Sequence, residues 1–400
     1  MSDVRPVADW KTDFDVLDQS YVNDPFSIWD DLRQTCPVAR TERRGPTWLP
    51  TKYQDVVDLA HDIAHFSSLD PVVIPIVGEE PEEPVLPYGL PPISADPPLH
   101  TSTRRLLLPW FSHHRVESYE PMTRALCAGL VEGLLADGRA DAAADYAQQI
   151  PVRVIAAILG VPSELSDTFT GWVRAFLEFA DDGEARREGM TALIEYFITE
   201  VERRKVEPGD DLLSDLLHAE IDGQPVEDSI VLGVAALTLI AGVDTTWSAI
   251  GSSLWHLATH PDDAKTLATD PEAMPLAVEE LLRAYSPVTM ARTVTEDVEF
   301  RGCPMRAEDK VLMNFPAANR DPEAFDHPDQ VILDRAHNRH VAFGSGIHRC
   351  AGSNLARMEL RVAIEEWLKR IPDFRIEEGA EVTWAGGQVR GPRQLPVVVP

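Results

Sequence analysis

The interpretation of this chain depends on ten residues near its C-terminus, Phe343-Gly344-Ser345-Gly346-Ile347-His348-Arg349-Cys350-Ala351-Gly352. They combine three glycines with one histidine and one cysteine, and they run directly into a helix-like segment that begins Ser353-Asn354-Leu355. Glycines at 344 and 346 permit backbone conformations that other residues avoid and let a flat ligand approach closely. A cysteine at the start of a helix gains thiolate stabilisation from the helix dipole, so the stretch predicts a thiolate that binds a metal.

Simpler explanations compete with a metal ligand. A lone cysteine is most often an inert core residue, and Gly-x-Gly alone is a weak signal for a phosphate loop. A zinc site would need further cysteine or histidine residues at short spacing, and Cys350 with His348 supplies too few. From these residues alone, a structural role and a ligand role are about equally supported.

The complete pattern, Phe-Gly-x-Gly-x-His-x-Cys-x-Gly followed by Leu-Ala-Arg, resembles the haem-ligand loop of cytochrome P450 enzymes. The resemblance implies that Cys350 is the axial thiolate ligand of the iron in haem b and that His348 binds a haem propionate. It also implies a mainly α fold with small β-sheets, in which the haem lies between a long central helix and the loop and helix that carry the cysteine.

Composition and charge limit the remaining possibilities. A length of 400 residues favours two or three lobes, whereas the resemblance implies one haem domain over 1–400, with about 1–25 as an irregular lead-in. The net charge of −30 makes nucleic acid and anionic membranes poor general partners. The four cysteines are far apart, and the N-terminus lacks an apolar signal segment. We expect a cytoplasmic monomer without disulfides.

Turn and strand signals outline the first half of the chain. Asp24-Pro25-Phe26 predicts the start of a helix with Asp24 as its cap, and the segments from Val38 and around Trp48 are predicted to pair as strands. Residues 67–98 are rich in proline and carry an acidic run at 79–83, which excludes a regular helix. Two interpretations remain equally supported, a solvated loop or, by the resemblance, a mobile lid over the substrate chamber.

Two further segments carry residues that the resemblance assigns to the haem propionates. Asp96-Pro97-Pro98-Leu99-His100 opens a helix, and His100 and Arg104 lie four residues apart on one face. This segment is similar to the family signature Asp-Pro-Pro-x-His-x-x-x-Arg, although leucine 99 replaces a frequent acidic residue. Arg292 matches the second propionate-binding arginine, and without the resemblance it would be an ordinary charge at a sheet edge.

The longest apolar segment, residues 228–255, predicts a central core helix. Hydropathy alone would allow a transmembrane span, but Asp244 in its middle and the hydroxyl cluster beside it argue against one. Ala241-Gly242-Val243-Asp244-Thr245-Thr246 resembles the P450 oxygen-activation motif. Gly242 would let the helix approach the haem, while Asp244 and Thr245 would form a catalytic proton route.

The remaining assignments concern the scaffold and the substrate. Glu280 and Arg283 are similar to the family's buried Glu-x-x-Arg pair, for which Arg335 is the matching third partner. From Glu117 to about His218 the pattern predicts a helical body, and in the family the helices near 165–205 roof the substrate pocket. By family position the pocket should be lined by five apolar residues: Leu237, Ile240, Ala241, Val288 and Met290. A hydrophobic substrate follows.

The resemblance therefore implies a haem-thiolate monooxygenase that inserts one atom of dioxygen into a hydrophobic small molecule. Electrons would come from NAD(P)H through a ferredoxin or flavodoxin and its reductase, since the chain contains no flavin or iron-sulfur motif. Two alternatives are a non-catalytic haem or partner-binding module and a peroxide-driven oxygenase. Asp244 and Thr245 argue against the binding module, which would not need a proton relay. An acidic or carboxylate-binding residue in place of the threonine would have favoured the peroxide-driven oxygenase.

Overall fold

The computed structural model describes residues 5–75, 85–135, 138–179 and 182–399. Most of the described chain is helical. The α-helices are α1 Gln19–Asn23, α2 Phe26–Thr35, α3 Tyr53–His61, α4 Leu99–Leu107, α5 His113–Leu134, α6 Gln149–Leu159, α7 Ser166–Glu178, α8 Gly183–Val206, α9 Leu212–His218, α10 Asp228–Thr259, α11 Pro261–Thr269, α12 Met274–Ala284, α13 Phe315–Ala318 and α14 Ser353–Arg370. A π-helical turn, η1 Ala142–Ala147, precedes α6, and 3₁₀ turns lie at η2 Ser163–Leu165, η3 Pro271–Ala273 and η4 Gly346–His348.

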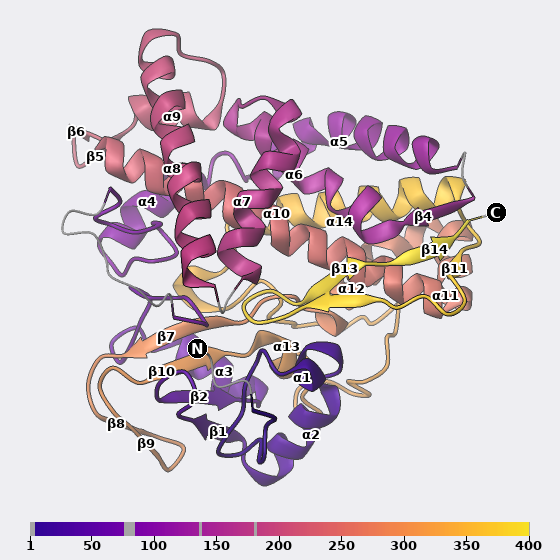
Figure 1. The fold of residues 1–400 in the computed structure, drawn as a ribbon, viewed down its shortest axis with the longest axis horizontal. Helices are drawn as coiled ribbons and strands as arrows, with labels where there is room; N and C mark the ends of the chain where they lie inside the picture. The colour runs from indigo at the N-terminus through magenta and orange to yellow at the C-terminus, as the bar shows by residue number, and fades with distance from the viewer. Residues whose placement is uncertain (1–4, 76–84, 136–137, 180–181, 400) are drawn as a thin grey trace.

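Short strands form several small sheets. The strands are β1 Val38–Thr41, β2 Thr47–Pro50, β3 Phe66–Ser67, β4 Arg139–Asp141, β5 Glu220–Ile221, β6 Gln224–Pro225, β7 Met290–Val294, β8 Val298–Phe300, β9 Cys303–Met305, β10 Lys310–Met313, β11 Arg375–Ile376, β12 Thr383–Ala385, β13 Gly391–Gln394 and β14 Pro396–Val398. The largest sheet has the order β1-β2-β10-β7-β3. In Figure 1 it lies beneath the main body of helices, beside α1, α2 and α3.

The register of this sheet joins distant parts of the sequence. β1 and β2 pair antiparallel with Val38 opposite Pro50, which confirms the predicted pairing. β10 pairs with β2 in parallel, Val311 lying opposite Trp48, and with β7 antiparallel, Val311 also lying opposite Arg292. This register therefore holds Arg292 in β7, the strand that follows α12 in the chain.

α10 runs through the centre of the helical body (Figure 1). Every residue from Ile230 to Ile240 is buried, because α6, α7, α8, α14 and β13 all pack against this helix. Within the described ranges, α10 alone is long and apolar enough to cross a bilayer, but 78% of its most apolar window is buried inside the fold. A helix that is apolar on all sides belongs at the centre of a core, so the prediction of a core helix is confirmed.

Residues 1–25 were predicted to form an irregular N-terminal segment, and this prediction is wrong for Gln19–Asn23. α1 forms within it, and Asp18 caps this helix by accepting a hydrogen bond from the Ser20 amide. Phe14, Val16 and Tyr21 are buried against the sheet, so apolar burial orders this segment. The next helix, α2, has Pro25 at its cap position, one residue after the predicted Asp24.

Part of the proline-rich segment 67–98 can be described. The acidic run at 79–83 lies outside the described residues. On its C-terminal side, the Asp96 carboxylate accepts hydrogen bonds from the Ser67 hydroxyl at 2.6 Å and the Ser68 amide at 2.9 Å. Ala95 is fully buried. These contacts fix the entry to α4, the helix that carries His100 and Arg104.

Candidate haem site

The cysteine loop has the backbone that its glycines predicted. Gly344 and Gly346 adopt φ values of +73° and +69°, in the left-handed region that side chains disfavour. A Cβ atom on Gly346 would also overlap the carbonyl oxygen of Ala60 at the end of α3. The loop closes through a hydrogen bond of 2.8 Å from the Cys350 amide to the Phe343 carbonyl. Glycine is therefore required both for the turn and for its packing on α3.

Cys350 lies three residues before α14, with an accessible side chain. Surrounding protein atoms nevertheless raise the pKa of its thiol by burial, and the Gly352 amide, Arg104 and Arg349 only partly oppose that effect. The Gly352 amide just before α14 acts in the predicted direction, because its hydrogen bond lowers the pKa of the Cys350 thiol. A metal ion removes the thiol proton on coordination, so a ligand role is unaffected.

Four cationic or titratable side chains gather beside Cys350. The rings of His100 and His348 lie with centroids 4.3 Å apart, although 248 positions of sequence separate the two residues, because α4 and the cysteine loop pack together. Arg104 donates a hydrogen bond to the backbone carbonyl of Arg349, which joins these same two segments. Arg292 is 5% exposed. None of His100, Arg104, Arg292 and His348 makes an ion pair with a carboxylate among the described residues.

Burial and mutual repulsion act on this cluster. Burial lowers the pKa of His348 to about 3, with further contributions from Arg292, His100 and Arg104. Burial likewise lowers the pKa of Arg292 to about 10. Both ring nitrogens of His100 and the Nε2 atom of His348 are buried without a hydrogen-bond partner. Buried donors without partners are costly, so this site fits a ligand that carries carboxylates, as the two propionates of haem do.

One face of α10 is open while its surroundings are packed. Between Ile230 and Leu254, the residues that are not buried are Ala241, Gly242 and Thr245. A spacing of four residues places 241 and 245 on one face, which is therefore the partly accessible face of this stretch of α10. The Thr245 hydroxyl donates a hydrogen bond of 2.7 Å to the Ala241 carbonyl, as its position in the sequence predicted.

Gly242 has a different role from the one expected. A Cβ atom at this position would overlap the side chain of Ile155 on α6. The glycine therefore permits the close packing of α6 on α10, rather than only an approach of α10 to a flat ligand. The sequence could not indicate this contact, because 87 residues separate the two positions.

Asp244 is 1% exposed and points to β13. Its Oδ1 atom accepts a hydrogen bond of 2.7 Å from Arg393, while its Oδ2 atom is buried without a partner. Burial raises the pKa of Asp244 to about 6, although Arg393 opposes this rise. No hydrogen bond joins Asp244 to Thr245 in the described structure, so the two residues of the expected proton route occupy different faces of α10.

The predicted pocket residues come from α10 and from the start of β7. Leu237 and Ile240 are buried, whereas Ala241, Val288 and Met290 are partly accessible. The amide of Gln388 donates to the Met290 sulfur at 3.6 Å, and Val288 forms an isolated bridge with Val389. Residues 388–389 are therefore neighbours of the predicted pocket that sequence reasoning missed.

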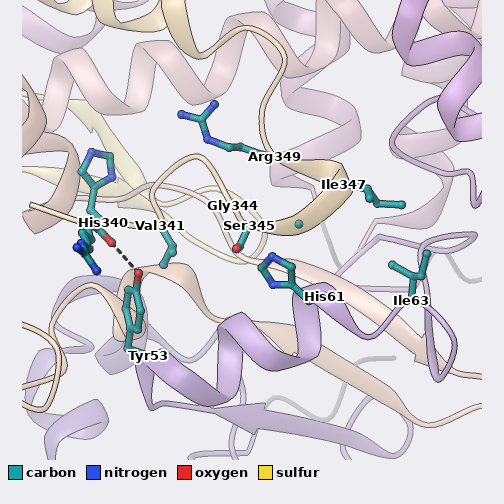
Figure 2. A pocket seen from close by; sticks show the side chains of 11 residues that line it. Tyr53, His61, Ile63, His340, Val341, Gly344, Ser345, Ile347 and Arg349 are labelled. Atoms are coloured by element: carbon teal, nitrogen blue, oxygen red, sulfur yellow. Dashed lines mark hydrogen bonds between the residues drawn. The ribbon is translucent and has the colours of Figure 1, made fainter.

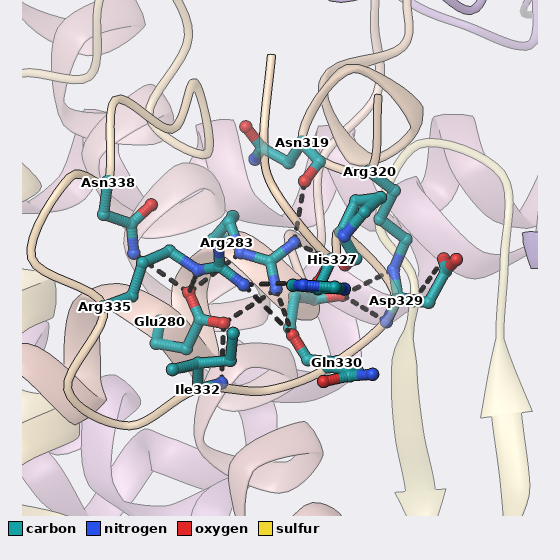
Figure 3. Close-up of polar contacts among 12 residues, drawn as sticks. Glu280, Arg283, Asn319, Arg320, His327, Asp329, Gln330, Ile332, Arg335 and Asn338 are labelled. Atoms are coloured by element: carbon teal, nitrogen blue, oxygen red, sulfur yellow. Dashed lines mark hydrogen bonds and ion pairs between the residues drawn. The ribbon is translucent and has the colours of Figure 1, made fainter. Parts of the chain in front are cut away.

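Glu280, Arg283 and Arg335 form one buried ionic network (Figure 3). Both carboxylate oxygens of Glu280 bind Arg283 through bonds of 2.8 Å, and Arg335 donates to Glu280 at 2.9 Å. Glu280 and Arg283 have no exposed surface. The Ile332 amide and the Asn338 side chain also donate to Glu280. This network ties α12 to the segment that leads into the cysteine loop.

A hollow of about 620 Å³ lies on the outside of the cysteine loop. Figure 2 shows its walls, with Tyr53 and His61 of α3 on one side and the loop from His340 to Arg349 on the other. The Tyr53 hydroxyl donates to the Arg339 carbonyl at 2.7 Å. Arg339 and Arg349 are exposed and make no ion pair with a described residue, whereas Arg357 binds Glu279.

Arg393 is the most important residue that the sequence did not indicate. It contacts Asp244 across 149 positions of sequence. A single arginine in the C-terminal segment has no motif around it, so only the packing of β13 on α10 reveals the contact.

Comparison with known proteins agrees with this geometry. The family model described as cytochrome P450 matches residues 152–379. The chain is similar to the mycinamicin IV hydroxylase/epoxidase of Micromonospora griseorubida, with 37% identity over 92% of this chain and 94% of the relative. It is also similar to the vitamin D(3) 25-hydroxylase of Pseudonocardia autotrophica, with 36% identity over 96% of both chains. The solved structure of the bacillaene polyketide synthase cytochrome P450 PksS of Bacillus subtilis 168 has a TM-score of 0.87 and 29% identity, over 96% of this chain and 99% of that one.

The chain therefore belongs to the cytochrome P450 family. It is a cytochrome P450 monooxygenase whose cofactor is protoporphyrin IX haem iron. The predicted fold, mainly α with small sheets, is confirmed.

Proposed function

We propose that this enzyme inserts one oxygen atom into a hydrophobic small molecule, with electrons from NAD(P)H delivered by a separate ferredoxin or flavodoxin and its reductase. The observation that carries the site assignment is the cluster of His100, Arg104, Arg292 and His348 beside Cys350, which has unpartnered buried nitrogens and no carboxylate partner. In this assignment Cys350 holds the iron and the other four hold the propionates. When bound, the haem supplies the activation of dioxygen.

A carbon monoxide difference spectrum of the reduced protein tests the ligand. We expect the band typical of thiolate ligation in the native protein and its loss in Cys350→Ser. Cys127→Ser is the matched control, because Cys127 is fully buried on α5, and it should keep the band. A histidine-type spectrum in the native protein would contradict the assignment of Cys350.

Thr245 is assigned to proton delivery because its hydroxyl lies on the open face of α10. The Oγ1 atom donates its proton to the Ala241 carbonyl and keeps lone pairs that can accept a hydrogen bond, so a relay through this hydroxyl requires the back-bond to open and release that proton. Thr245→Val keeps the shape and removes this hydroxyl. We expect the product formed per NAD(P)H consumed to fall by about tenfold or more, within the range of lost general acid catalysis. Thr238→Val is the control, since Thr238 makes the same back-bond, to Val234, at a buried position. Equal effects of the two substitutions would contradict the assignment.

The substrate is proposed to be hydrophobic because the five predicted pocket residues are apolar. Two relatives are named for mycinamicin IV and vitamin D(3), which supports screening large apolar compounds first. A spin-state change of the haem absorbance on titration identifies binding. Met290→Asn is expected to weaken binding of any apolar hit by about 1–3 kcal/mol, the cost of desolvating a neutral amide. Unchanged affinity would place the substrate elsewhere.

The redox partner is proposed to dock over the outer hollow beside the cysteine loop. Two of the four arginines between 339 and 361 are neutralised, Arg357 by Glu279 and Arg361 by Glu120, and Arg104 is turned inward. Arg339 and Arg349 remain as exposed charges in a chain of net charge −30, and they would guide an acidic ferredoxin or flavodoxin.

Reduction rates measured against ionic strength test this surface. Arg349→Glu should slow reduction at low salt and flatten the salt dependence, because a charge reversal removes electrostatic steering. Arg139→Glu is the control, since Arg139 is exposed on β4, away from α3 (Figure 1). Unchanged rates in Arg349→Glu would refute the docking surface.

We further propose that residues 1–400 act as one haem domain and that the protein is a cytoplasmic monomer. Support for one domain comes from α10, which packs against elements from both halves of the chain. Light scattering at increasing concentration tests the monomer, and a dimer mass would contradict it.

A further inference from the structure

Glu279 on α12 binds two side chains that come from opposite ends of the cysteine loop. Its Oε2 atom accepts hydrogen bonds of 2.9 Å from Nη2 of Arg357 and of 2.9 Å from Nε2 of His340, and its Oε1 atom accepts one from Nε of Arg357. His340 precedes Cys350 in the chain, whereas Arg357 follows it on α14. One carboxylate therefore connects the two ends of the loop.

The entry to the loop is held through His340, whose side chain is 3% exposed. Its Nδ1 atom accepts a hydrogen bond of 3.2 Å from the Ala342 amide, so the ring proton lies on Nε2 and is donated to Glu279. The Val341 amide donates to the Asn319 side chain at 2.7 Å. Hydrogen bonds on two consecutive residues thus fix the backbone that enters the loop.

The exit from the loop is held through Arg357. Its guanidinium lies 4.5 Å from the ring centre of Phe343, and its Nη1 atom donates to the Ser353 carbonyl at 3.4 Å in the first turn of α14. The Phe343 carbonyl accepts the Cys350 amide, and the Gly352 amide donates to the Cys350 sulfur. Both hydrogen bonds of the cysteine therefore involve backbone next to a group that Arg357 contacts.

Glu279 acts here as a carboxylate. Burial favours its protonated form, but the hydrogen bonds from His340 and Arg357 outweigh burial and lower its pKa to about 2. The side chains of Glu279 and Arg357 are 28% and 29% exposed, so solvent screens their attraction and the pair adds little to stability. Its main effect is to fix the geometry of the loop.

We propose that Glu279 is a positioning residue that ties both ends of the cysteine loop to α12 and keeps the Gly352 amide directed at the Cys350 sulfur. This inference rests on the proposed role of Cys350 as the iron ligand. A hydrogen bond to a coordinated sulfur withdraws electron density from it and raises the reduction potential of the metal. Glu279 thereby influences the potential at which the enzyme accepts an electron.

Resonance Raman spectra and redox titrations of the haem-loaded protein test this role. Glu279→Gln keeps the volume and removes the charge that holds Arg357 and His340, while Val341 stays bound to Asn319, so the loop should still fold. We expect the iron–sulfur stretching band to move to higher frequency and the reduction potential to become more negative, because a sulfur that loses a hydrogen bond donates more strongly to the iron. Arg357→Gln should shift both values in the same direction, and Arg357→Lys should shift them less. Combining Glu279→Gln with Arg357→Gln should add little to either single shift, since both changes break the same contact.

Glu120→Gln is the matched control. Glu120 on α5 also binds two arginines, Arg124 at 2.8 Å and Arg361 of α14 at 2.6 Å, and its side chain is 29% exposed. This variant should leave the band and the potential unchanged. Shifts in Glu279→Gln that are no larger than those in Glu120→Gln would overturn the inference. A native spectrum without an iron–sulfur stretch would instead refute the assignment of Cys350, so the two failures are distinguishable.

Discussion

Replacing Glu280 by glutamine is expected to be among the most destabilising single changes in this protein. The carboxylate is fully buried, and it accepts hydrogen bonds from Arg283, Arg335, Asn338 and the Ile332 amide. Glu280→Gln keeps the volume but leaves two buried guanidinium groups without their anion. Removing one partner of a buried ion pair commonly costs ~3–5 kcal/mol, which is a large share of the ~5–15 kcal/mol that keeps a protein folded.

Urea unfolding followed by circular dichroism, with haem content per protein measured in parallel, checks this value. The expected result is a lower unfolding midpoint and reduced haem content. The control is Glu323→Gln, which breaks the ion pair with Lys52 at a carboxylate that is 69% exposed and should cost less than ~1 kcal/mol. If Glu280→Gln costs no more than this control, the argument from buried charge is refuted.

The remaining predictions concern pH and the cysteine loop. Burial raises the pKa of Glu359 to about 8 from an ordinary value of 4.5, so the folded state holds an extra proton between these values. The free energy of unfolding should therefore fall by roughly 3–4 kcal/mol as pH rises from 4.5 to 8, and Glu359→Gln should remove this part of the pH dependence in denaturant titrations. Gly346→Ala should abolish haem binding measured by absorbance, because the new Cβ overlaps the Ala60 carbonyl. Gly302→Ala, where φ is +79° but the space is open, should cost only ~1–2 kcal/mol and keep the haem.

The sequence predicted those structural features that depend on residues close together in the chain. The apolar run of α10, the positive φ angles of Gly344 and Gly346 and the back-bond of Thr245 all depend on neighbouring residues, and each was predictable. Short α1 was missed because tertiary burial of Tyr21, rather than periodicity, orders it.

Several functional details depended on contacts that no local pattern encodes. Gly242 faces Ile155 of α6, whereas the sequence indicated only a close approach of α10 to the haem. Arg357 is paired with Glu279, so the number of arginines between 339 and 361 overstates the free positive charge of this segment.

The sequence by itself determined the family and the members of the Glu280 network, and it is the basis for proposing Cys350 as the iron ligand, because its motifs carry the residue types that this chemistry requires. The tertiary structure alone decided which way Asp244 points and which residue holds it. Arg393 reaches Asp244 only because β13 packs on α10. A buried carboxylate is costly unless a cation pairs with it, and the tertiary packing determines which cation that is.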